Sequence, residues 1–139
     1  MGREMNEKIT IQVFCEINPS EDLEKIKTSI FNLFPDLKIK IQENRLSGSS
    51  NDIELLSKVI KSIKNRQTVS VLSRIMKTNM AENSTWFYLN KQAAFVDVIA
   101  LCNDADESAL GPIKIVLNSN NIDDIIAVSY THLTLPTKA

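Results

Sequence analysis

The aromatic and basic side chains that could do chemistry in this 139-residue chain lie close together in two segments. In one of them, the aromatic run 86–88 comes just before Asn90, Lys91 and Gln92. Aromatic rings beside cations on a sheet can stack on bases and hold phosphates. The alternative is a strand that packs its rings inside and is followed by a polar turn. We favour that alternative for the rings, since aromatic side chains on strands usually belong to the core.

The second segment is basic and alternating. Lys38 and Lys40 point to the outer face of a predicted strand, and Arg45 follows just beyond it. The three cations could form one basic stripe. They could equally belong to an ordinary solvated face or protect the edge of a sheet.

Histidine chemistry is not expected, because the single histidine, His132, lies in a tail that does not match the rest of the chain. Residues 128–139 lack helical and strand periodicity. VSYTHLTLPT in this tail resembles one reading frame of a common sequencing-library adapter. We therefore treat residues 128–139 as a non-native tail, a real irregular tail being the alternative. Without His132, Ser-His-Asp and Cys-His catalysis and histidine metal ligation are excluded.

Metal and nucleotide cofactors are not expected either. The acidic loop over residues 103–107 lacks the glycine and the distal glutamate of a calcium loop. The chain has three glycines, too few and too scattered for a phosphate-binding loop of the Walker or dinucleotide kind. We predict no cofactor, no metal site and no enzymatic activity, with an enzyme of unrecognised site as the least favoured alternative.

Composition indicates one soluble domain. The net charge of −1 and the isoelectric point near 5.8 argue against nucleic-acid or membrane binding over the whole surface, but allow a local basic patch. Cys15 and Cys102 form no CxxC pair and are expected to be buried thiols, with a disulfide as the less favoured alternative. We find no signal peptide and no transmembrane run, and expect a cytoplasmic protein.

Hydrophobic periodicity predicts an α+β domain over residues 1–127. Strands are expected over 8–17, 37–42, 85–90 and 112–118, with a short strand near Arg45, and residues 95–102 are expected to form another strand or a buried segment. Helices are expected over 23–34, 53–63, 69–76 and 121–127. Adjacent strands grouped between helices favour a mostly antiparallel sheet with helices packed on one face.

Five segments occur in an order that resembles a known family. They are EINPSED (16–22), IFNLFP (30–35), RLSGSS (45–50), FYLNKQAAFV (87–96) and LGPIKI (110–115). Together they resemble the archaeal uncharacterised protein family 0201. The resemblance implies the fold of the large-subunit ribosomal protein that binds five-S ribosomal RNA, and a grouping with RNA-binding or exosome-associated proteins. The chain departs from the family at Asp97, where we expect a small residue, and in its final helix, which lacks the expected continuation.

Two main hypotheses follow. The first is a non-enzymatic RNA-binding module, with an exposed aromatic ring stacking on a base. Its RNA contacts would be Lys38, Lys40, Arg45, Asn90, Lys91 and Gln92. The second is a protein-interaction or assembly module, such as a homodimer, which the acidic isoelectric point suits better. Convergence of the lysines and Arg45 with Lys91 on one concave face would favour RNA, and their scattering would favour the interaction module.

Overall fold

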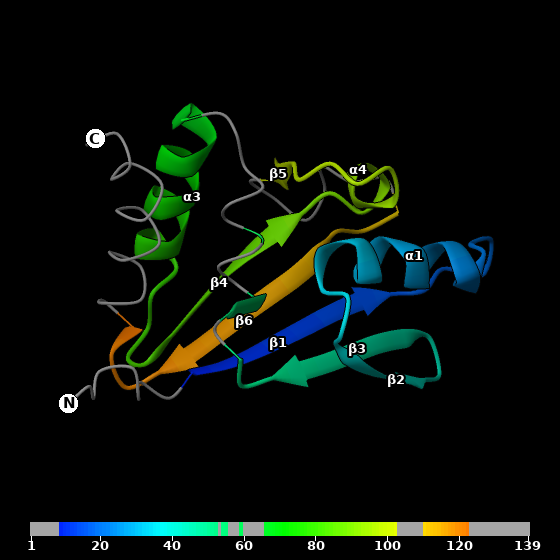
Figure 1. Ribbon diagram of the computed structural model, residues 1–139, viewed down its shortest axis with the longest axis horizontal. Helices are drawn as coiled ribbons and strands as arrows, with labels where there is room; N and C mark the ends of the chain where they lie inside the picture. Colours follow the sequence, from blue (N-terminus) through cyan, green and yellow to red (C-terminus); the bar gives the residue numbers. More distant parts are fainter. Residues whose placement is uncertain (1–8, 53, 56–58, 60–65, 103–109, 123–139) are drawn as a thin grey trace.

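The computed structural model describes residues 9–52, 54, 55, 59, 66–102 and 110–122. They form one antiparallel sheet of six strands in the order β2-β3-β1-β6-β4-β5 (Figure 1). The elements are β1 (Ile9–Glu16), α1 (Leu23–Leu33), β2 (Lys38–Gln42), β3 (Arg45–Ser50), α3 (Arg66–Thr78), β4 (Ser84–Leu89), α4 (Lys91–Phe95), β5 (Leu101–Cys102) and β6 (Ile113–Ser119). The α+β class and the antiparallel sheet are confirmed.

The centre of the sheet is the pair β1 and β6, whose apolar residues alternate as predicted. In the register of these strands, Val13 lies opposite Ile115, which lies opposite Phe87 of β4. All three side chains are buried. Every second residue of β1, β6 and β4 therefore points to the same core, and the residues between them point to the opposite face.

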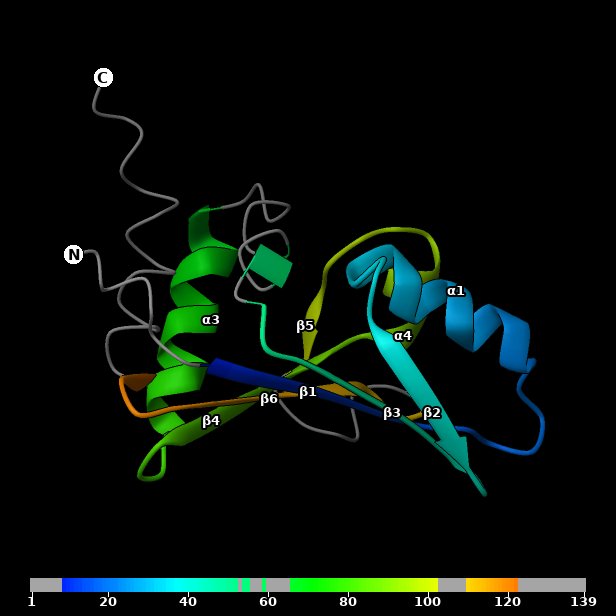
Figure 2. The same ribbon diagram turned by 60° about the horizontal axis from the view of Figure 1, so that its bottom comes forward.

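The helices α1, α3 and α4 lie on one face of the sheet (Figure 2). Helix α1 begins after Asp22, whose carboxylate accepts a hydrogen bond from the Glu24 N–H at 3.0 Å, and it buries Ile26, Ile30 and Leu33. Pro35 follows the helix closely, since the residue before proline avoids the helical conformation. Among the described helices, none is long and apolar enough to cross a membrane.

Two predicted helices are described only in part. Leu55 and Val59 are helical and buried, in agreement with a helix over 53–63, but much of that range lies outside the described residues. Ile122 is helical, and the rest of the predicted final helix lies outside them as well. So do the acidic loop over 103–107 and the tail with His132.

The strand predicted over residues 95–102 is wrong for most of its length. Asn90 caps the short helix α4 instead, because its side-chain oxygen accepts a hydrogen bond from the Ala93 N–H at 2.8 Å. Asp97 then adopts a left-handed conformation with φ of 63°, which aspartate tolerates and a strand does not. Val96 and Val98 are exposed, and pairing begins only at β5.

Candidate nucleic-acid interface

The face of the sheet opposite these three helices is polar, aromatic and basic. We call it the open face and define it by the half-buried or exposed residues that alternate with the core positions of the five longer strands. They are Thr10, Gln12, Phe14, Glu16, Lys38, Lys40, Gln42, Arg45, Ser47, Ser49, Ser84, Trp86, Tyr88, Lys114, Val116 and Asn118. Its cations outnumber its one carboxylate, Glu16, although the chain as a whole is slightly acidic.

Three aromatic rings lie on the open face. Trp86 and Tyr88 come from β4, with ring centroids 5.1 Å apart and planes tilted by 56°. Phe14 comes from β1 and is half-buried. The expectation that the 86–88 rings pack inside is therefore right for Phe87, which is 1% exposed, and wrong for Trp86 and Tyr88. The reason is the two-residue period of a strand, which sends adjacent rings to opposite faces.

The cations of the open face lie in register with these rings. One row across the sheet runs through Lys40, Ser47, Phe14, Lys114 and Tyr88. The Lys114 ammonium lies 4.9 Å from the centroid of the Trp86 ring, and the Arg45 guanidinium lies 5.8 Å from that of Phe14. These separations are in the range of cation–π attraction, which holds both cations against the sheet.

The structure brings together three of the six predicted contact residues. Lys38, Lys40 and Arg45 are exposed on the same face of β2 and β3. Sequence reasoning missed Lys114 as their companion. The sequence did contain a signal for Lys114. Ile113 and Ile115 alternate toward the core, so Lys114 between them must point to the opposite face.

The other three predicted residues lie on the helix-bearing side. The Asn90 side chain caps α4, as described above. Gln92 is exposed and borders a pocket of about 350 Å³ between α1 and α4, together with Lys25 and Phe95. Neither residue is placed to act with the cations of the open face.

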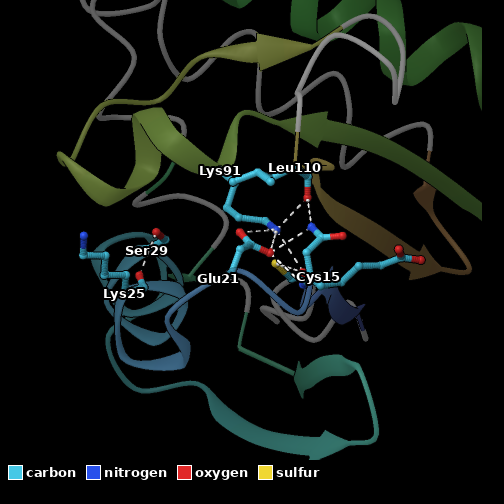
Figure 3. Close-up of polar contacts among 8 residues, drawn as sticks. Cys15, Glu21, Lys25, Ser29, Lys91 and Leu110 are labelled. Atoms are coloured by element: carbon cyan, nitrogen blue, oxygen red, sulfur yellow. Dashed lines mark hydrogen bonds and ion pairs between the residues drawn. The ribbon is translucent and has the colours of Figure 1, made fainter.

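Lys91, which was predicted to contact RNA, is buried and does not lie with Arg45 on the open face. Its side chain is 4% exposed and that of Glu21 is 7% exposed. The two side chains point toward each other (Figure 3). The Lys91 ammonium donates to both carboxylate oxygens of Glu21 at 3.0 Å, and to the carbonyls of Glu16 and Leu110 at 2.9 Å. The ammonium thus joins the end of β1, the turn before α1, the start of α4 and the approach to β6.

Asn18 completes this network around the Glu21 carboxylate. Its backbone N–H and its side-chain amide donate to Glu21 Oε1 at 2.8 and 2.9 Å, and the amide also donates to the Leu110 carbonyl. Burial alone would raise the pKa of Glu21, but the hydrogen bonds from Asn18 and Lys91 outweigh it and hold that pKa below its usual value of 4.5.

The lowered pKa of Glu21 predicts a loss of stability in acid. Because the folded-state pKa lies below the unfolded value, the carboxylate stabilises the fold above pH 4.5, and this contribution disappears as the pH falls through the folded-state pKa. We expect Glu21→Gln to reduce the free energy of unfolding at neutral pH and to flatten its dependence on acid pH, as measured by urea denaturation. Glu24→Gln, at an exposed position of α1, should keep the wild-type slope. If the free energy of unfolding of Glu21→Gln depended on acid pH as steeply as that of the wild type, this would contradict the lowered pKa of Glu21.

Cys15 and Cys102 are both buried and are not joined by a disulfide, as predicted. Burial raises the pKa of the Cys15 thiol to about 11, in spite of the neighbouring Lys91 ammonium, so the thiol stays protonated at neutral pH and is a poor nucleophile. Within the described ranges, no group of three or more histidine, cysteine or acidic side chains is placed to hold a metal ion.

Comparisons with known proteins bear on the family and the fold of this chain. A family model described as RNA binding matches residues 8–119. A UPF0201 protein from Methanothermobacter thermautotrophicus is 32% identical over 118 residues, which cover 84% of this chain and 86% of that protein. A UPF0201 protein from Sulfurisphaera tokodaii is 33% identical over 114 residues, or 79% and 77% of the two chains. The crystal structure of a UPF0201 protein from Methanococcus jannaschii superposes with a TM-score of 0.69 at 28% identity, covering 84% of this chain and 89% of that one.

Proposed function

This chain belongs to the archaeal UPF0201 family, and a family model described as RNA binding matches its residues 8–119. On that premise we propose that it is a non-enzymatic RNA-binding module. The main support is the convergence of four cations and three aromatic rings on the open face. The cations are Lys38, Lys40, Arg45 and Lys114, and the rings are Phe14, Trp86 and Tyr88.

The chemistry of the open face suits binding. Lysine and arginine side chains neutralise phosphates, and the counterions released in this way supply most of the affinity of a non-specific nucleic-acid contact. The neighbouring hydroxyl groups of Ser47 and Ser49 can donate to phosphate or sugar oxygens. The Lys91–Glu21 pair is already saturated by internal partners, so we assign it to the fold and leave it out of the RNA contacts.

Removing the basic stripe is expected to weaken RNA binding and its dependence on salt. We predict that the triple variant Lys38→Ala/Lys40→Ala/Arg45→Ala binds structured and unstructured RNA more weakly. The plot of log affinity against log salt should become shallower by about 0.7 per lost contact, or about 2 in total. Fluorescence anisotropy titrations at several salt concentrations measure both quantities.

The matched control is Lys77→Ala, which removes one exposed lysine from the last turn of α3 on the helix-bearing side. Its affinity and salt slope should equal those of the wild type. Equal slopes for the triple variant and the wild type would count against the open face as the RNA site. A wild-type protein that retains no RNA at low salt would remove the proposed function altogether.

One observation favours the assembly module as a second candidate. Apolar side chains near the contact of α1 with α4 are exposed: Phe31 by 37%, Phe95 by 39%, Val96 by 64% and Val98 by 50%. Exposed apolar groups of this kind can mark protein contacts. Multi-angle light scattering of the purified protein separates the two, because a monomer that binds RNA fits the first candidate and a stable dimer without RNA affinity fits the second.

A further inference from the structure

We propose that the open face selects single-stranded RNA, and that its three rings stack on unpaired bases. This inference rests on the proposed function and narrows its ligand. Bases in an RNA duplex are stacked on one another inside the helix, so a ring on a protein surface reaches them only where the strand is unpaired. A binding face whose contacts were limited to phosphate would need no rings.

The placement of the rings suits successive bases. Trp86 and Tyr88 are two residues apart on β4, point to the same face and lie 5.1 Å from each other. Phe14 lies in the same row as Tyr88, with β6 between their strands. Two strand spacings separate them, about 10 Å. The half-buried rings are fixed by the sheet, so little side-chain freedom is lost when a base stacks on them.

The cations occupy the positions that a strand of phosphates needs. Lys114 lies between Phe14 and Tyr88 in their row, and Lys40 continues the row at its β2 end. Lys114 rests over the Trp86 ring and Arg45 over the Phe14 ring, so a base that stacks on the same ring face displaces the cation from it. Each cation is therefore within the length of its own flexible side chain of a phosphate that flanks a base on that ring.

A polar groove adjoins the basic end of this face. Its polar lining is two carboxylates, one cation, three amides and a hydroxyl, from Glu16, Asn18, Gln42, Glu43, Asn44, Arg45 and Ser47. Amide and carboxylate groups can pair with the Watson–Crick edge of a base, which an unpaired nucleotide exposes and base pairing in a duplex occupies. The groove therefore adds to the preference for unpaired nucleotides.

The single tryptophan of the chain, Trp86, reports on this proposal directly. We expect single-stranded oligouridine and oligoadenine to quench its fluorescence as they bind, because contact with a stacked base opens a non-radiative decay path for the excited indole. An oligomer of the same length and charge with abasic sites should bind more weakly and quench little. A fully paired duplex should also bind more weakly and should leave the emission unchanged. These measurements use the wild-type protein and need no variant.

Variants then test each ring. Tyr88→Leu and Phe14→Leu keep an apolar side chain on the sheet and should each weaken single-strand binding on the order of ten-fold. Phe31→Leu is the matched control, since it removes an exposed ring from α1 on the opposite side. Thermal melts show whether each variant is folded.

The outcomes separate this inference from the proposed function. Equal binding of the abasic oligomer, or tighter binding of the duplex, with unchanged Trp86 emission would overturn the single-strand preference and leave RNA binding in place. Loss of binding in Phe31→Leu equal to that in Tyr88→Leu would also overturn it. Absence of binding to every RNA would remove the proposed function and the inference together.

Discussion

Lys91→Met is expected to lower the free energy of unfolding by about 3–5 kcal/mol, the usual cost of leaving one member of a buried ion pair without its partner. The variant leaves the Glu21 carboxylate buried with fewer donors, and it removes the donor to the carbonyls of Glu16 and Leu110. Urea denaturation followed by circular dichroism measures the loss.

Two further variants make this prediction specific. Lys77→Met, at an exposed position, should change the free energy of unfolding by roughly 0.5 kcal/mol or less. The double variant Glu21→Leu/Lys91→Met should recover much of the loss, since apolar residues often replace a buried ion pair without cost. A loss in Lys91→Met as small as that in Lys77→Met would show that the ammonium is not buried in solution.

Phe87→Ala is expected to destabilise the protein by about 3–5 kcal/mol, whereas Tyr88→Ala, at the next residue of β4, should cost roughly 1 kcal/mol. Phe87 is 1% exposed and pairs with Ile115 in the core. Tyr88 is half-buried on the open face, where its ring contacts Trp86. The free energies of unfolding of the two variants, measured under the same conditions, test which face each ring occupies.

RNA affinity should show the opposite order for the same two variants. Under conditions where both are folded, Tyr88→Ala should bind RNA more weakly and Phe87→Ala should bind it as the wild type does. A Phe87→Ala protein that is folded but has lost RNA binding, beside an unaffected Tyr88→Ala protein, would contradict the assignment of the two faces.

Much of the sheet could be predicted from alternation alone. The strands over 8–17 and 112–118 correspond to β1 and β6, because each buries one face and exposes the other. The strand over 37–42 corresponds to the edge strand β2, where Ile39 is half-buried and Ile41 is exposed. The strand predicted over 95–102 does not form over most of its length, for a local reason. Its apolar residues resemble a strand, but the Asn90 cap and the left-handed Asp97 give a helix and a turn instead.

The site was predictable only where periodicity decides it. Lys38, Lys40 and Arg45 share a face because strand pairing puts them there, and Lys114 follows from the same rule. The burial of Lys91 could not be anticipated, since its partner Glu21 is 70 residues away and Leu110 is 19 residues away. Only the folded chain brings the three together, and a lysine outside such a network would be expected in solvent.

The position of β6 has a consequence for the order in which the protein folds. The two hairpin-like halves of the sheet, β1-β3-β2 and β4-β5, share no strand pairing with each other except through β6. The ladder between Ile9–Glu16 and Ile113–Ser119 closes a loop of nearly the whole described chain, and loop closure of that kind is slow because its entropy is lost before the contacts form. We expect refolding to be limited by the arrival of β6. Until β6 pairs with them, β1 and β4 each have an unpaired backbone edge. These edges are the parts of the incompletely folded chain that are most prone to aggregation.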